Sequence, residues 1–162
     1  MNGLTPGLLD RLLGAGDARP GASWTLEQYK DSVARDLEDL LNTRCALAPE
    51  LLSDYPECAS SIINYGLRDF AGLCMSSSAD RARICAALSA AVERHEPRLR
   101  KVRAQLDYQQ GTINRISFVI SAELAAPALN AAVSFDAVLQ PSSLHYAIQR
   151  SSHHHSARGA QS

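Results

Sequence analysis

The chain has 162 residues, a length that suits one domain, and its 46% hydrophobic content supports a modest core and excludes a disordered chain. Aromatic residues make up only 6%, so we expect a core of leucine, isoleucine, valine and alanine. The formal net charge of −1 argues against a general binder of nucleic acid or of anionic membranes, because both need an excess of basic residues.

The first segment, residues 1–22, contains a short leucine-rich stretch and a glycine-rich link, "GAGDARPGAS". Leu8, Leu9, Leu12 and Leu13 fall on one face of a predicted amphipathic helix. Two interpretations stay open: this helix docks on another protein, or it lies on its own domain. The segment lacks the basic start and long apolar centre of a signal peptide, and no apolar run reaches the ~20 residues that span a bilayer. We therefore expect a cytoplasmic protein without direct membrane insertion.

Two longer helices are predicted next. Thr25 and Gln28 have the spacing of a capping box, and so do Ser77 and Asp80. The buried stripes expected behind these caps are Val33, Leu37, Leu40 and Leu41 in the first helix, and Ile84, Leu88, Ala91 and Val92 in the second.

Between these helices, Ile62 and Ile63 are expected to be buried on a short helix that follows Pro56. Gly66 is expected to stop that helix, because glycine readily adopts a positive φ.

The second helix meets the sequence Glu96-Pro97-Arg98. A residue before proline is pushed out of the α region, so the helix is expected to end at this trio and the chain to turn sharply. The basic residues that follow belong to a segment with a two-residue period.

Three strands are predicted after the corner. The alternating apolar positions are Val102, Ala104, Leu106 and Tyr108 in the first strand, Ile116, Phe118, Ile120, Ala122 and Leu124 in the second, and Val133, Phe135, Ala137 and Leu139 in the third. A turn around Gly111 and another at Pro127 favour an antiparallel meander. The predicted fold is α+β, with N-terminal helices packed on a three-stranded antiparallel sheet. One domain, residues 23–140, is expected to be followed by a flexible tail, residues 141–162.

The sequence offers little support for catalysis or for a cofactor. Glu93 and Glu96 could form a carboxylate pair, but the basic residues beside Glu96 would lower its pKa, which is the wrong direction for a general acid. Nucleotide-binding and common hydrolase motifs are absent from the sequence. The histidines at 153–155 lie in a serine-rich polar tail, where a solvated segment is favoured over a metal site. Glu96-Pro97-Arg98 therefore favours a structural corner or a rigid polar anchor for another protein.

Six segments carry a family resemblance, in the order "LLDRLL", "SVARDLEDLLNTR", "NYGLRDF", "HEPRLRKVRAQL", "FVISAEL" and "VSFDAVL". Their succession closely resembles the type VI secretion baseplate subunit family TssE. It is similar, more distantly, to the small baseplate wedge protein of contractile phage tails, a family once labelled lysozyme-related. The resemblance covers most of the chain. This family usually has proline after "NYGL", where the present chain has Arg68, and that departure leaves the shape of the loop open.

The resemblance implies a cytoplasmic structural protein in a six-fold baseplate docked at the inner-membrane complex. Its expected partners are other wedge subunits and the contractile sheath, whose strand-exchanging domain the fold resembles. The family's assembly motif falls on Glu96, Pro97 and Arg98, and an exposed sheet edge is expected to accept a sheath strand. The alternatives are a peptidoglycan-cleaving, lysozyme-like hydrolase and a small regulatory adaptor on the same fold.

Overall fold

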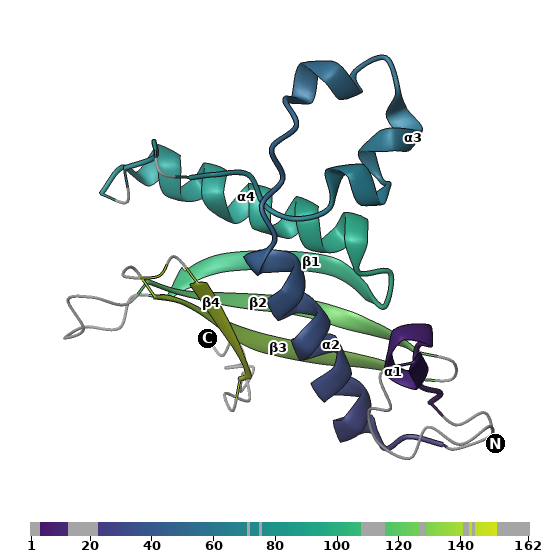
Figure 1. Ribbon diagram of the computed structural model, residues 1–162. Helices are drawn as coiled ribbons and strands as arrows, with labels where there is room; N and C mark the ends of the chain where they lie inside the picture. Colours follow the sequence, from purple (N-terminus) through teal and green to yellow (C-terminus); the bar gives the residue numbers. More distant parts are fainter. Residues whose placement is uncertain are drawn as a thin grey trace, which may run out of the picture.

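A computed structural model describes residues 4–12, 23–70, 72–74, 76–107, 116–126, 129–140, 143 and 145–151 (Figure 1). The helical elements are α1 (Leu8–Leu12), α2 (Leu26–Asn42), η1 (Pro49–Leu52), α3 (Pro56–Ala59), η2 (Ile62–Asn64) and α4 (Ser78–His95). The strands are β1 (Leu99–Asp107), β2 (Ile116–Ala126), β3 (Leu129–Gln140) and β4 (His145–Arg150). Leu13, the link at residues 14–22, Tyr108, the predicted turns at Gly111 and Pro127, and the histidines at 153–155 lie outside the described residues.

The strands form one antiparallel sheet in the order β1-β2-β3-β4. The α+β architecture is confirmed, but the prediction of three strands is wrong, because the described sheet has four. The additional strand, β4, lies where a flexible tail was expected. It was missed because only Tyr146 and Ile148 give it an alternating apolar pattern, and two such positions are too few to indicate a strand.

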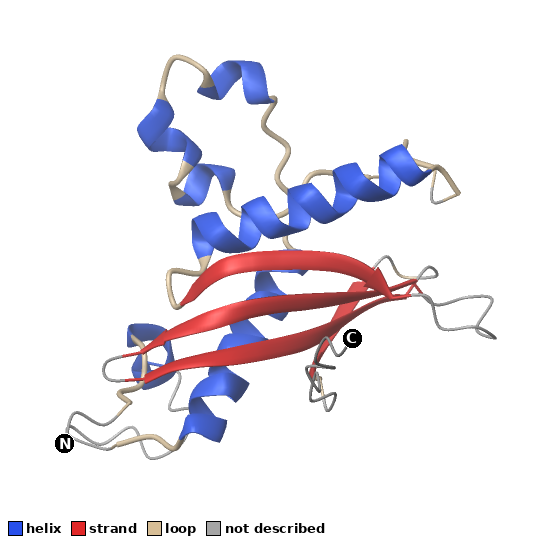
Figure 2. Ribbon diagram, turned by 180° about the vertical axis from the view of Figure 1, so that it is seen from behind, coloured by secondary structure: helices blue, strands red, loops and turns tan. Residues whose placement is uncertain are grey.

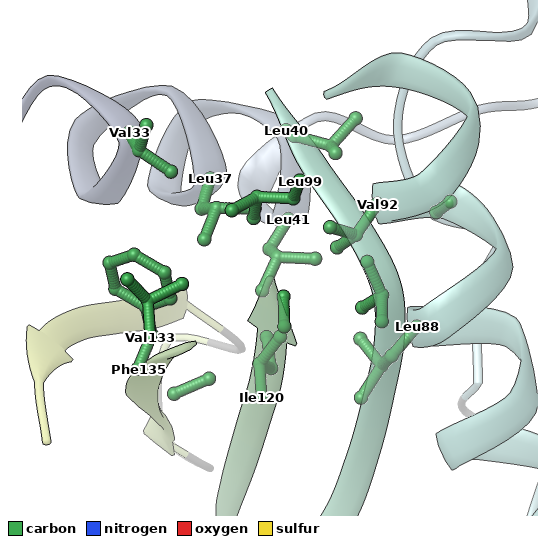
Figure 3. Close-up of a cluster of buried hydrophobic side chains, with 14 of the residues drawn as sticks. Val33, Leu37, Leu40, Leu41, Leu88, Val92, Leu99, Ile120, Val133 and Phe135 are labelled. Atoms are coloured by element: carbon green, nitrogen blue, oxygen red, sulfur yellow. The ribbon is translucent and has the colours of Figure 1, made fainter. Parts of the chain in front are cut away.

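The core lies between α2, α4 and one face of the sheet. Helix α2 crosses that face in Figure 1, and no described helix covers the opposite face, which is turned to the viewer in Figure 2. Figure 3 shows Val33, Leu37 and Leu41 of α2 pointing toward Ile120 and Phe135 of the sheet. Both predicted helical stripes are confirmed as buried.

The N-terminal caps are confirmed in part. Thr25 and Gln28 form the complete capping box, with both reciprocal hydrogen bonds. Ser77 accepts from the Asp80 N–H, but the Asp80 carboxylate accepts from the Cys74 N–H instead of completing the box. Asp80 thereby fixes the chain entering α4.

The outer edge of β1 is closed by side chains of α4 at four-residue spacing. The Val102 N–H donates to Glu93 Oε1 (3.1 Å), and the Ala104 N–H donates to Ser89 Oγ (2.9 Å). Four residues of a helix and two residues of a strand both advance about 6–7 Å. Side chains four residues apart on α4 can therefore reach N–H groups two residues apart on β1.

The outer edge of β4 is closed in the same manner by α2. Asn42 donates to the Tyr146 carbonyl (2.9 Å) and accepts from the Tyr146 N–H (2.7 Å). Glu38, one turn earlier, accepts from the Ile148 N–H (2.9 Å). The N–H groups of Val102 and Ala104 on β1 and of Tyr146 and Ile148 on β4, which an added strand would need, are therefore already hydrogen-bonded.

The N-terminal half of β3 is different. β4 pairs only with Phe135–Gln140 of β3, and the Ser151 N–H adds one bond to the Ser134 carbonyl (3.0 Å). Residues 129–133 of β3 therefore have β2 on one side and no described strand on the other. By the alternation of an antiparallel strand, Ala132 directs its N–H and carbonyl to the open side, as Ser134 does.

Residues 45–66 form an arm that contains η1, α3 and η2 and stands on the side of α4 away from the sheet (Figure 1). A parallel bridge between Arg44 and Leu67 closes its base. Gly66 adopts φ +108, as expected, and a Cβ there would lie 2.4 Å from the Thr43 carbonyl oxygen. The expectation that Ile62 and Ile63 are buried is wrong: they are 85% and 58% exposed. The arm meets the core through Cys45 and Tyr65, whereas the two isoleucines stay at the surface.

Candidate functional site at the acid–proline–arginine corner

The corner forms because the sequence stops a helix and starts a strand within three residues. Glu96 caps α4, and its N–H donates to the Val92 carbonyl (2.8 Å). Pro97 cannot continue the helical hydrogen bonds. The Leu99 N–H then donates back to the Glu96 carbonyl (3.0 Å), and β1 begins. The predicted corner is confirmed.

Glu96 and Arg98 pair with each other on the inner side of the corner. Arg98 Nε donates to Glu96 Oε1 (2.7 Å), and Arg98 Nη2 donates to Glu96 Oε2 (2.5 Å). The Arg98 backbone N–H adds a bond to Oε1 (3.1 Å). Glu96 is only 4% exposed, so this is a buried, two-pronged ion pair with both carboxylate oxygens satisfied.

The same guanidinium reaches α2. Arg98 Nη1 donates to Ser32 Oγ (3.1 Å), and Nη2 also forms an ion pair with Asp36. The Arg98 guanidinium carbon lies 5.7 Å from the centre of the Tyr29 ring, a cation–π distance. Arg98 therefore ties the start of β1 to three residues of α2.

The cluster continues to the N-terminal helix through a buried acid. Asp10 of α1 is 3% exposed, accepts from Ser32 Oγ (2.9 Å) and forms an ion pair with Arg35. The Gly7 N–H also donates to Asp10 (3.0 Å). Helix α1 thus lies on its own domain, held there by the hydrogen bond and the ion pair of Asp10.

Of the four leucines predicted to dock a partner, three lie within the described residues. Leu8, Leu9 and Leu12 belong to α1, and Leu12 is 72% exposed. Their role in docking a partner stays a prediction.

The neighbouring carboxylates keep the Arg98 guanidinium in its charged form. Burial disfavours the charged form of Arg98, but the hydrogen bonds and charges of Glu96 and Asp36 outweigh it and raise the pKa of Arg98. Burial also raises the pKa of Asp36, and the charge of Arg98 counteracts that effect in part. The guanidinium is thus the permanent positive centre around which the two carboxylates are arranged.

This arrangement is suited to holding elements together and poorly suited to acid–base catalysis. The carboxylate of Glu96 is buried and engaged by Arg98, and Glu93 accepts from the Val102 N–H. Neither acid lines the pocket that the described residues form beside α4, whereas a glycosidase needs two carboxylates on either side of a bound sugar. Of the trio, Pro97 is the exposed residue.

Sequence comparison then decides the family. The family described as baseplate wedge protein gp25 matches residues 27–128, which is more than half of the chain. The chain belongs to the baseplate wedge protein gp25 family. The match spans the corner and the α2 residues of the cluster, and it confirms the resemblance drawn from the motifs.

Membership assigns this wedge protein a structural role in a phage-tail-like baseplate, in contact with other baseplate proteins. No curated protein and no solved structure matches the chain. Among its described helices, none combines the length and the apolar character needed to cross a bilayer.

Five residues of the cluster were not predicted from the sequence: Asp10, Tyr29, Ser32, Arg35 and Asp36. Asp10 offered a signal, because it is an acid inside the leucine run "LLDRLL". The other four lie on α2, and only the tertiary fold brings them to Asp10 or Arg98.

Proposed function

We propose that this wedge protein is a structural, non-enzymatic component of a type VI secretion baseplate. In this proposal it joins the wedge complex on the cytoplasmic side of the inner-membrane complex and starts assembly of the contractile sheath. Membership of the wedge family supports the structural role, and the ordered resemblance to TssE motifs supports the secretion system.

The corner would serve assembly through its outer side. Glu96 and Arg98 are used inside the chain, so they hold the corner rigid, while exposed Pro97 meets the partner. A surface that is already rigid loses little conformational entropy on docking. In this proposal Glu96 and Arg98 stabilise the corner from inside, and Pro97 contacts the partner.

The experiment is co-purification of wedge proteins from cells that carry Pro97→Glu. The change places a charge on the outer side of the corner and leaves the ion pair between Glu96 and Arg98 intact. We expect the protein to stay folded and the recovered wedge proteins to fall at least several-fold. Pro56→Glu, at another exposed proline, is the control and should recover the wedge proteins normally. Normal recovery with Pro97→Glu would contradict the assembly role of the corner.

Sheath assembly would use the open edge of β3. The outer edges of β1 and β4 are occupied by helix side chains, whereas residues 129–133 have no described strand on the side away from β2. Strand addition at such an edge is a common mode of protein association. The sheath strand is therefore expected beside residues 129–133 of β3, and not at either outer strand of the sheet.

A further inference from the structure

A groove separates α4 from the chain that returns from the arm. Its volume is about 380 Å³. One wall is the α4 face away from β1, and the opposite wall is formed by residues 64 and 66–70 together with Leu73. Cys45 at the base of the arm completes the lining. The groove is distinct from the corner cluster, because none of the residues that bind Arg98 lines it.

The α4 wall has the pattern of a helix-packing surface. Arg83, Ala87, Ala90 and Arg94 recur at steps of four, three and four residues, so they form one stripe along the helix. The two alanines are small enough for a second helix to approach closely. The arginines mark the ends of a stripe about 16 Å long.

The groove carries an excess of positive charge. Arg68 faces it from the wall opposite Arg83 and Arg94. Among the described residues, no carboxylate forms an ion pair with Arg68 or Arg94, and Arg83 is 3.6 Å from Asp80 with a side chain that is 72% exposed. The acid of the lining, Asp69, already has an interaction of its own. Three arginines are thus available to an acidic ligand.

Apart from Asn64, the rest of the lining is largely apolar. Phe70 and Leu73 lie opposite the alanines, and both are partly buried against the core. A nucleic-acid strand would gain little from alanine and leucine side chains, whereas the apolar stripe of an amphipathic helix would pack against them. Glutamates flanking that stripe would meet the arginines at both ends of the groove.

We propose that this groove binds an acidic amphipathic α-helix of a partner protein. The helix spans at least three turns, places small apolar residues over Ala87 and Ala90, and pairs its carboxylates with Arg68, Arg83 and Arg94. This proposal rests on the proposed function, because it assumes that the partner is another baseplate protein. It adds that the segment of that partner which binds here is an acidic helix.

The test uses the full chain and two designed helical peptides labelled for fluorescence anisotropy. Both peptides carry the same alanine- and leucine-rich stripe; one has glutamates beside it, and its twin has lysines at the same positions. We expect the acidic peptide to bind roughly tenfold or more tightly than the twin, because several ion pairs of ordinary strength add to the same apolar contact.

Three variants make the test specific to the groove. Arg94→Glu should weaken the acidic peptide severalfold and strengthen the lysine twin. Arg103→Glu, at an exposed arginine of β1 outside the groove, changes the net charge equally and should leave both affinities unchanged. Ala90→Trp fills the groove and should weaken both peptides, while a thermal melt confirms that the domain is folded.

Three results would overturn the proposal: no binding of the acidic peptide, equal binding of the two peptides, or equal losses from Arg94→Glu and Arg103→Glu. Displacement of the acidic peptide by a single-stranded DNA oligonucleotide at similar concentration would also overturn it, because it would show recognition of negative charge alone. Such failures leave the co-purification test of the corner unaffected, so the two proposals can fail separately.

Discussion

Glu96 places a carboxylate in the interior and satisfies both of its oxygens with Arg98. Removing one partner of a buried pair leaves an uncompensated charge and typically costs about 3–5 kcal/mol, whereas an exposed pair contributes about 0.2–1 kcal/mol. The chain holds an example of each kind. Lys101 and Glu123 pair at 2.8 Å with side chains that are 74% and 46% exposed.

We therefore expect Glu96→Ala to lower the free energy of unfolding by about 2–4 kcal/mol, because Asp36 still offers Arg98 one carboxylate. Glu123→Ala is the matched control and should cost less than about 1 kcal/mol. Denaturant unfolding of the two variants, followed by circular dichroism, measures both values. A loss for Glu96→Ala no larger than that for Glu123→Ala would show that the corner does not hold the fold.

The elements themselves were largely predictable, and the reason is periodicity. Val33, Leu37, Leu40 and Leu41 form a stripe that only a helix makes, and β2 and β3 alternate over long runs. The corner at the end of α4 was predictable from a single residue, Pro97. These features depend on neighbours in sequence, which is why sequence patterns indicate them.

Features that depend on distant contacts were not predictable from the sequence. The burial of Asp10 depends on Ser32 and Arg35, and the stability of β4 depends on Asn42 and Glu38. No local pattern records these pairings. Likewise, Ile62 and Ile63 look like core residues in the sequence, but their arm extends away from the core.

The open segment of β3 gives a prediction at the level of an element. Ala132→Pro removes the outward N–H within residues 129–133, so an added sheath strand would lose a hydrogen bond and meet the proline ring. We expect fewer sheaths to assemble in cells, counted with a fluorescent sheath subunit, while wedge proteins still co-purify. A melting temperature close to that of the unchanged protein is the control for folding.

Normal sheath assembly by a folded Ala132→Pro protein would exclude this edge as the site of strand addition. A failure of wedge co-purification by the same variant would instead point to a wider loss of the fold. The two measurements together separate these causes.

The whole molecule keeps its internal and external contacts on different parts of the fold. Helices α2 and α4 cover the core face of the sheet and close the outer strands, and the Arg98 cluster links β1, α2 and α1. Among the described residues, the exposed Pro97, the β3 backbone at residues 129–133 on the side away from β2, and the arginine-lined groove beside the arm are left for other proteins. Separate surfaces of this kind would let one subunit contact more than one baseplate protein at the same time.

A density map of the assembled baseplate containing this chain tests the account most directly. It should show Pro97 against a neighbouring protein, with Glu96 and Arg98 still paired to each other inside the chain. A map in which the corner faces solvent, or in which a partner residue replaces Arg98 on Glu96, would contradict the account.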